Sequence, residues 1–338
     1  MTVTVAPPSP AVAHPALPRQ VGSQRAAIGC LLRDTTAVVG LAIVVLLVVG
    51  AVLAPELAPH DPNHVDVLRK FAPPSAAFPL GTDNLGRDVL SRLLYGGRIS
   101  IGTAVVAGVL IGAIGTLIGL VVGYRGGILD VAVGRVVDLL LAFPPFLLAM
   151  AILGLLGPGL RNLTLVLIGV AWASYARIVR SAVLVERHKE YVEAARASGA
   201  SSLRVMARHV LPNIFAPIMV LVTLDMGIVL LEISGLSFLG LGVSPPTPEW
   251  GAMLSEGRTY LSQAPQMMLF PGLAIFLLVL GFNLFGDGLR DAFDPQTRRL
   301  PRGRRRWLIA GPRAGPHRGR RFSGSPTPAV RRRRGVGT

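Results

Sequence analysis

Cysteine, lysine and charge of either sign are scarce in this sequence of 338 residues. Cys30 is the only cysteine, which excludes an intrachain disulfide and a zinc site built from cysteines. Lysine occurs only as Lys70 and Lys189, and no segment has the spacing G-x-x-x-x-G-K-[ST], so the sequence lacks a P-loop for ATP. Only 15% of the residues are charged, against about 25% in soluble domains. With a mean hydropathy of +0.56, this composition argues against a soluble globular enzyme.

The net charge of +16 is concentrated near the C-terminal end. Residues 298–338 contain 14 arginines and no acidic residue, whereas the rest of the chain carries 20 basic and 18 acidic residues. A segment rich in Arg, Pro and Gly cannot bury a core, so we expect residues 298–338 to be a disordered Arg-rich tail. Two interpretations remain open, namely binding to anionic lipid at the inner surface and a dispensable extension. A specific nucleic acid is not an expected partner, because aromatic residues are not interleaved with the arginines.

Long uncharged runs occupy most of the remaining sequence. A helix that crosses a bilayer needs about 20 mostly apolar residues. Six runs approach this requirement, at 35–55, 99–124, 139–160, 162–185, 214–240 and 259–286. Arg177 and Arg180 interrupt the fourth run, and Asp225 and Glu232 interrupt the fifth. The sequence therefore predicts an all-α integral membrane protein with six transmembrane helices.

The basic residues between these runs predict the orientation. With the N-terminus inside, the inner segments carry 13 Lys and Arg without the tail, and the outer segments carry seven. Because basic residues are enriched in cytoplasmic segments, both termini are expected in the cytoplasm. The predicted organisation is a cytoplasmic segment over 1–34, a first transmembrane helix over 35–55, an outer loop over 56–98, a five-helix core over 99–297, and the tail.

Glycine and proline mark two features inside the predicted helices. Glycines recur every three or four residues in the second run, at Gly108, Gly112, Gly115, Gly119 and Gly123. Small residues at this spacing let two helix backbones approach closely in a membrane, so we expect a helix-packing face. Pro144 and Pro145 remove two backbone donors from the third run, which predicts a kink or a break there.

The polar segment at about 186–212 is expected to form two short helices on the cytoplasmic face. Residues 190–197 are strong helix formers, and Gly199 is a helix stop. Ser201 and Ser202 are candidates to cap a second helix that reaches about His209, and Pro212 should end it and start the next transmembrane helix. Small residues in the first helix leave a low surface on which another protein can dock.

This segment resembles the EAA loop of permeases from ATP-binding-cassette (ABC) importers. The resemblance rests on Glu193-Ala194-Ala195, Gly199 and Leu211-Pro212. Further motifs resemble the dipeptide, oligopeptide and nickel branch of that family, and in particular the second of its two permease subunits. These motifs are Gly81-Thr82-Asp83 and Gly86-Arg87-Asp88 in the outer loop, with others at 236–242, 245–251 and 283–295.

The resemblance implies a fold, a function and a set of partners. The fold is the type I ABC-importer permease architecture in a bacterial inner membrane, and the EAA loop couples it to ATPases. The implied substrates are dipeptides or short oligopeptides, with nickel or glutathione as the alternative. The implied partners are a second homologous permease subunit, two cytoplasmic ATPase subunits, an extracytoplasmic substrate-binding protein and membrane lipid. The chain itself is then no enzyme and binds no cofactor, because the partner subunits bind Mg and hydrolyse ATP. A stand-alone channel or secondary transporter is less favoured, since no internal repeat is visible.

Two pairs of side chains are candidates for a polar path or a metal site. Asp225 and Glu232 lie seven residues apart and so share a helix face, and carboxylates inside a membrane are costly. They form either a polar stripe along the translocation path or structural hydrogen bonds to a neighbouring helix. His60 and His64 have a spacing that suits a metal only within a helix. Prolines beside them disfavour a helix, and we expect no metal site.

Overall fold

The computed structural model describes residue 29 and residues 31–293, and these residues form helices and loops without a β-strand. Five helices are long and apolar enough to cross a membrane. They are α2 (Thr35–Val52), α4 (Val89–Arg125), α7 (Leu160–Glu186), α10 (Leu211–Phe238) and α12 (Gln266–Phe293), and the helical segment that contains α10 starts at Ser202. The all-helical prediction is confirmed for the described residues.

The third apolar run is not one continuous helix. Its residues are divided between the end of α5 (Gly127–Leu141) and α6 (Pro145–Leu156), whose axes are bent by 86°. The break follows from Pro144 and Pro145, which lack backbone N–H donors and force the residues before them out of the helical region. The twelve residues of α6 rise only about 18 Å, less than the roughly 30 Å of a bilayer core. The described residues therefore contain five single spans, or six if the bent pair is one span.

The second long helix begins earlier than its uncharged run. It starts at Val89, ten residues before Ile99, because the carboxylate of Asp88 accepts a hydrogen bond from the backbone N–H of Ser91 and caps the helix. Arg92 lies inside the helix, where acidic partners surround its guanidinium. The outer loop thus ends at Asp88, and it is preceded by the short helix α3 (Ala54–Leu57). The last long helix begins later than predicted, after the short helix α11 (Trp250–Gly257).

The glycine face of α4 packs against two other helices, as predicted. A methyl group at Gly115 would lie 2.8 Å from the carbonyl oxygen of Trp172, and one at Gly119 would lie 2.6 Å from that of Ala176. These backbones of α4 and α7 are therefore too close for any side chain between them. Gly108, earlier in α4, is covered by a side chain instead, since a methyl group there would lie 2.8 Å from Sδ of Met226 in α10.

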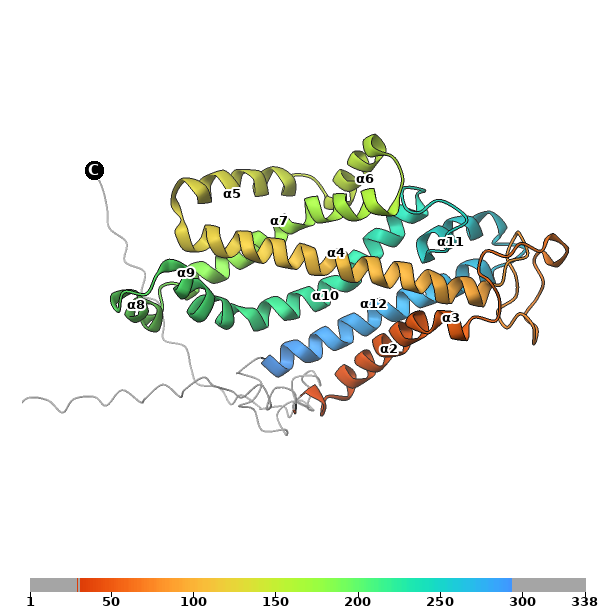
Figure 1. Ribbon diagram of the computed structural model, residues 1–338, viewed down its shortest axis with the longest axis horizontal. Helices are drawn as coiled ribbons and strands as arrows, with labels where there is room; N and C mark the ends of the chain where they lie inside the picture. The colour runs from red at the N-terminus through yellow and green to blue at the C-terminus, as the bar shows by residue number, and fades with distance from the viewer. Residues whose placement is uncertain (1–28, 30, 294–338) are drawn as a thin grey trace, which may run out of the picture. The chain divides into compact units, whose positions relative to one another are not determined.

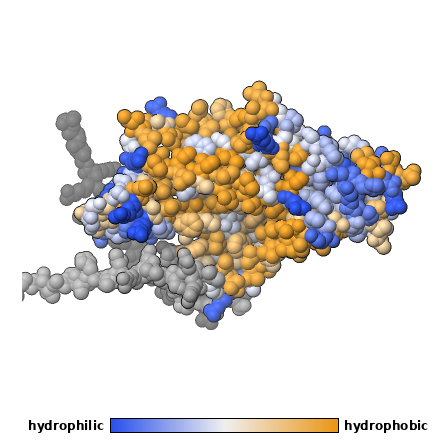
Figure 2. All heavy atoms as spheres, in the orientation of Figure 1, coloured by the Kyte–Doolittle hydropathy of each residue, from blue (hydrophilic) through white to orange (hydrophobic). Residues whose placement is uncertain are grey.

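The polar segments lie at opposite ends of this helix bundle (Figure 1). The segment between α7 and α10, with α8 (Glu190–Ala197) and α9 (Ser202–Val205), occupies one end. The loop 58–88 and α11 occupy the other end. Figure 2 shows hydrophobic side chains over the middle of the visible face and hydrophilic side chains toward both ends, which suits a protein surrounded by lipid.

Candidate functional site

The first short helix of the inner loop, α8, has the ends that were predicted. Glu190 and Glu193 stand in its first turn, where their charge complements the N-terminal end of the helix dipole. Gly199 follows the helix with a φ of +80°, a conformation that costs a side chain energy but suits glycine. The N–H of Ala200 bonds to the carbonyl of Ala195, and the N–H of Gly199 bonds to that of Arg196. This Schellman pattern closes the helix, so the predicted stop at Gly199 is confirmed.

The second half of the inner loop differs from the prediction. Ser201 stands at the start of α9, but its side chain makes no capping hydrogen bond. The chain then stays helical through a π-helical turn, Met206–Val210, into α10, so Pro212 does not end a helix. In this wide turn the N–H of Leu211 bonds to the carbonyl of Met206, five residues back. Pro212 has no backbone N–H, and at the start of α10 this missing donor is not needed for a helical hydrogen bond. The helix therefore continues through the proline.

The inner loop is fastened to the end of α7 by a buried carboxylate. Glu186 is only 6% exposed, and it accepts a hydrogen bond from the hydroxyl of Tyr191 and an ion pair from Lys189, with Nζ and Oε2 2.6 Å apart. Burial, and then the nearby Glu186 carboxylate, raises the pKa of Tyr191 above its usual value. The tyrosine therefore stays protonated as a donor, which holds the first turn of α8 in place.

The last turn of α8 is fastened to α4. The guanidinium of Arg196 lies 4.8 Å over the ring of Tyr124, and its Nε donates to the tyrosine hydroxyl at 3.1 Å. Val192 is fully buried and packs in one cluster with residues of α4, α7 and α10. Both ends of the short helix are thus tied to the long helices beneath it.

The residues of the EAA pattern lie mainly on the outside of this anchored loop. Glu193, Ala194, Gly199 and Pro212 are exposed, whereas Ala195 and Leu211 are half-buried and pack against the cluster below. A methyl group at Gly199 would meet no atom within 4 Å, so only its backbone conformation requires glycine. The exposed part of this pattern therefore consists of small residues and the carboxylate of Glu193.

The two intramembrane carboxylates have different surroundings. Both are half-buried on α10, and their spacing corresponds to about 10 Å along the helix. Asp225 accepts a hydrogen bond from Tyr175 of α7, whose ring is buried between the packed helices. This contact is compatible with a structural role for Asp225, and the roles of both carboxylates stay predictions.

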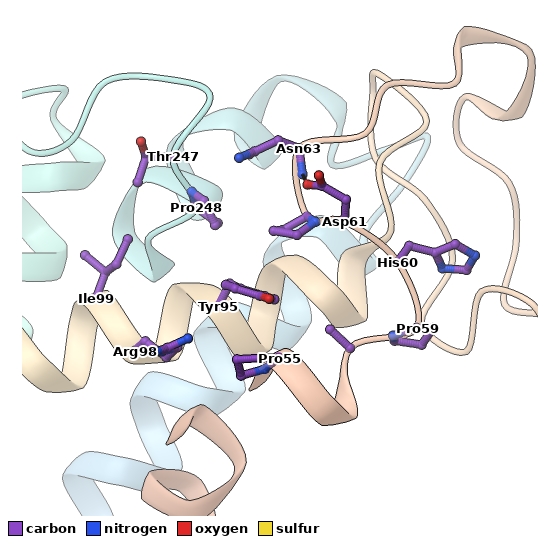
Figure 3. A pocket seen from close by; sticks show the side chains of 12 residues that line it. Pro55, Pro59, His60, Asp61, Asn63, Tyr95, Arg98, Ile99, Thr247 and Pro248 are labelled. Carbon is purple, nitrogen blue, oxygen red and sulfur yellow. Dashed lines mark hydrogen bonds between the residues drawn. The ribbon is translucent and has the colours of Figure 1, made fainter. Parts of the chain in front are cut away.

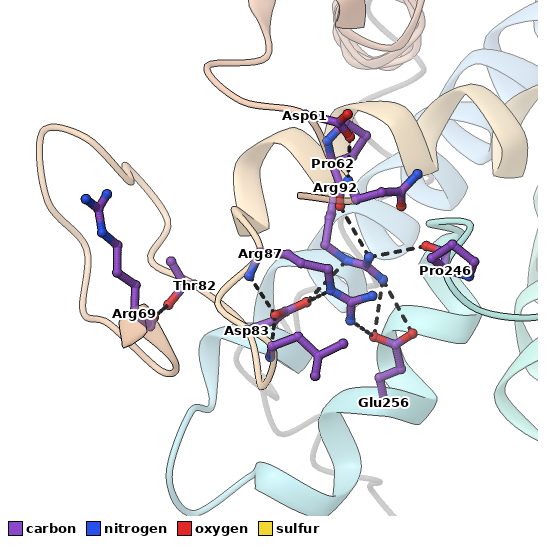
Figure 4. Close-up of polar contacts among 11 residues, drawn as sticks. Asp61, Pro62, Arg69, Thr82, Asp83, Arg87, Arg92, Pro246 and Glu256 are labelled. Carbon is purple, nitrogen blue, oxygen red and sulfur yellow. Dashed lines mark hydrogen bonds and ion pairs between the residues drawn. The ribbon is translucent and has the colours of Figure 1, made fainter. Parts of the chain in front are cut away.

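The outer-loop motif forms a buried network of charges (Figure 4). Oδ2 of Asp83 accepts a hydrogen bond from Nε of Arg87 at 2.6 Å and lies 3.5 Å from Nε of Arg92. Glu256 of α11 lies on the other side of the two arginines, 2.7 Å from Arg87 and 3.2 Å from Arg92. Asp83, Arg87 and Arg92 are nearly inaccessible to solvent. Two positive and two negative side chains thus join the outer loop and α4 to α11.

The remaining motif residues shape the loop around this network. Gly81 and Gly86 both have a φ of +77°. A methyl group at Gly86 would lie 1.8 Å from the carbonyl oxygen of Asp66, so the close chain crossing there requires glycine. The Thr82 hydroxyl donates to the carbonyl of Arg69 and accepts from the N–H of Ala72 at 2.8 Å. The motif residues are therefore buried parts of a scaffold.

A second buried carboxylate holds α11 against α4. Glu249 is completely buried, and it accepts hydrogen bonds from the N–H groups of Gly251 and Ala252 and from the hydroxyl of Ser100 at 2.8 Å. The indole N–H of Trp250 donates to the carbonyl of Leu93 at 2.9 Å.

Within the described residues, no group of three His, Cys, Asp or Glu is placed to hold a metal ion. His60 is instead stacked on Phe78, with ring centres 4.7 Å apart.

Comparison with known proteins decides the family. The family described as "Binding-protein-dependent transport system inner membrane component" matches residues 115–299, and the "N-terminal TM domain of oligopeptide transport permease C" matches residues 26–74. The chain belongs to this family of ABC-importer permeases. It is a multi-pass inner membrane protein and a permease subunit, in agreement with the motifs.

Relatives of the permease carry names with different substrates. It is 42% identical to the dipeptide transport system permease protein DppC of Alkalihalophilus pseudofirmus, over 82% of this chain and 91% of the relative. It is 44% identical to the glutathione transport system permease protein GsiD of Pectobacterium atrosepticum, over 79% and 89%. It is 42% identical to the nickel transport system permease protein NikC of Escherichia coli, over 75% and 92%.

Sequence reasoning missed three parts of the permease's polar framework. Glu256 and Glu249 lie in the short segment before the last long helix; Glu256 was not singled out, and Glu249 entered only as a member of the motif at 245–251. Glu256 pairs with Arg87, 169 residues away, and Glu249 with Ser100, 149 residues away, so no local pattern reveals these contacts, although the cap that Glu249 forms on Gly251 and Ala252 is local. Glu186 was also missed, although a carboxylate three residues before Lys189 on a helical segment is a recognisable signal.

Proposed function

We propose that this permease is one of two related membrane subunits of an ABC importer for dipeptides or short oligopeptides. Two cytoplasmic ATPases bind at the inner loop, and an extracytoplasmic binding protein delivers substrate at the opposite end. The bent pair α5–α6 is one crossing, which makes six spans and leaves both termini in the cytoplasm. The excess of basic residues on the inner side supports this orientation.

The observation that carries the proposal is the anchoring of the inner loop. Glu193 and Ala194 face outward, while Tyr191 and Arg196 of the same helix hold the ends of α7 and α4. An ATPase that moves α8 therefore moves two long helices with it. Because α4 and α7 are in backbone contact along their glycine face, they respond together. ATP-driven closure is thereby converted into the change between inward-open and outward-open states.

Of the two intramembrane carboxylates, we assign Glu232 to the translocation path. Asp225 has Tyr175 as a structural partner, which supports the other interpretation for that residue. Glu232 lies farther toward the outer end of α10 and belongs to the same helix face.

The proposal is tested with the complete importer in proteoliposomes. The Glu193→Ala variant is expected to lose uptake of a labelled dipeptide. Its ATP hydrolysis is expected to become independent of substrate. Glu190→Ala is the matched control, because it removes another exposed carboxylate from the same helix turn. Normal ATPase binding and normal uptake by Glu193→Ala would contradict the coupling role of the loop.

The names of the relatives favour a second candidate, an importer for glutathione or nickel. Uptake of labelled dipeptide, glutathione and Ni²⁺ is compared in cells that carry or lack this subunit. The peptide assignment predicts that only dipeptide uptake depends on it. Dependence of Ni²⁺ or glutathione uptake alone would establish the second candidate.

A further inference from the structure

An apolar groove runs between the outer parts of α4 and α7. It has a volume of about 690 Å³ and is open along the side of the bundle. Val106 and Leu110 of α4 line it on one side, and Leu165 and Ile168 of α7 line it on the other. Such a lining suits a hydrocarbon chain and not a hydrophilic peptide.

A glycine keeps this groove open. A methyl group at Gly102 would meet no atom within 4 Å, whereas Gly108 and Gly115 of the same helix are covered by side chains or backbone of neighbouring helices. Gly102 lines the groove and is exposed. A larger residue there would fill the space without disturbing the packing of the helices.

Two arginines also line the groove. They are Arg98 of α4 and Arg161 in the first turn of α7, and both are exposed. Among the described residues, no carboxylate forms an ion pair with either of them. The acidic side chain that shares the adjoining pocket with Arg98, Asp61, instead accepts a hydrogen bond from the N–H of Asn63 at 2.8 Å (Figure 3). The guanidinium of Arg98 lies 5.9 Å from the ring centre of Tyr95, a contact that does not neutralise its charge, so both arginines can bind an anion.

We propose that this groove binds one anionic phospholipid. Its acyl chain lies between α4 and α7 over Gly102, and its phosphate lies between Arg98 and Arg161, whose planar donor groups match phosphate oxygens. Arg98 lies in the half of α4 away from Tyr124 and the inner loop, and Arg161 lies at the start of α7, away from the end that carries the inner loop. The proposed function, on which this point rests, places the inner loop in the cytoplasm. The lipid then belongs to the outer leaflet of the membrane.

The test measures bound lipid directly. The complete importer is placed in nanodiscs of phosphatidylcholine and phosphatidylglycerol in equal amounts, and the lipids that remain attached are counted by native mass spectrometry. The wild type should retain phosphatidylglycerol. Gly102→Leu should lose it, whereas the control Gly134→Leu, at an equally open glycine of α5, should retain it. Removing each arginine, with Arg98→Gln and Arg161→Gln, should reduce the preference for phosphatidylglycerol roughly fivefold.

Two results would overturn the proposal. One is equal retention of phosphatidylglycerol by the wild type and Gly102→Leu. The other is a photoreactive residue at Val106 that crosslinks to the second permease subunit and not to lipid, which would show that protein fills the groove. Neither measurement requires transport. A failed uptake assay would contradict the proposed function and leave the lipid result standing.

Discussion

Arg196 in the last turn of α8 lies over the ring of Tyr124 near the end of α4, and donates a hydrogen bond to its hydroxyl. The same end of α4 receives a second arginine, because Arg187 donates to the carbonyl of Gly123 at 3.0 Å. Ion pairs from Asp130 to Arg180 and from Asp138 to Arg177 also join α5 to α7. The inner ends of three helices are thus tied to the loop that an ATPase is proposed to move.

Arg196→Gln is expected to weaken coupling and leave the fold intact. The change removes a cation–π contact of about 1 kcal/mol and a hydrogen bond of similar size. Substrate-stimulated ATP hydrolysis should fall severalfold, while basal hydrolysis and thermal unfolding stay near the wild type. Arg204→Gln, at an exposed arginine in α9, is the control and should behave as the wild type. Equal losses in both variants would refute a specific role for the contact with Tyr124.

Substitutions of Gly199 should rank by their tolerance of a positive φ. The residue has a φ of +80° and open space around its Cα, so strain is the only cost of a side chain. Asn tolerates this region better than Val, for which it costs roughly 1–2 kcal/mol. Dipeptide uptake should therefore decrease from wild type to Gly199→Asn to Gly199→Val. An equal effect of Asn and Val would indicate that the ATPase contacts the glycine itself.

Gly115→Ala should destabilise the pair of long helices. Its new methyl group would lie 2.3 Å from Cβ of Tyr175 and 2.8 Å from the backbone oxygen of Trp172, so the helices must move apart. Overpacking of this kind costs about 1–3 kcal/mol. Thermal unfolding in detergent should shift to lower temperature, whereas Gly102→Ala, in open space on the same helix, should not shift it downward. Unchanged stability of Gly115→Ala would show that α4 and α7 are less closely packed.

Loss of Glu256 should destabilise the outer end of the permease. In Glu256→Gln, two buried arginines keep only Asp83 as a counter-charge. Breaking a buried ion pair on one side costs on the order of 3 kcal/mol. Protease cleavage in the loop 58–88 should become faster, and Glu256→Asp should restore part of the protection. Equal cleavage of wild type and Glu256→Gln would show that the network does not hold the loop.

Glu232→Gln and Asp225→Asn should have different effects. If Glu232 lines the path, its neutral variant should change the KM or the maximal rate of dipeptide uptake without altering stability. Asp225→Asn changes a side chain that bonds to buried Tyr175, so it should affect thermal unfolding more than uptake. The reverse pattern would exchange the two assignments.

Local signals predicted the parts of the molecule that depend on neighbours in sequence. The ends of α8 follow from two glutamates and one glycine within ten residues, and the break before α6 follows from tandem proline. Pro212 was correctly predicted to stand at the start of the next long helix, since α10 begins at Leu211, but the break before it was wrong, because a π-helical turn keeps the chain helical. The start of α4 was misread because the prediction followed the uncharged run from Ile99, which leaves out Arg92, although Asp83 and Glu256 neutralise this arginine inside the helix.

By itself, the sequence determined that the chain is helical, lies in a membrane and carries the family motifs, because apolar run length and basic residues act locally. The tertiary structure alone decided what the motif residues contact. Asp83 and Arg87 became part of a buried network only when Glu256, 169 residues beyond Arg87, reached them. Gly102 became part of a groove, and α7 became the partner of the predicted glycine face at Gly115, only through the placement of α7. Contacts of this kind depend on how distant helices pack, which no local pattern encodes.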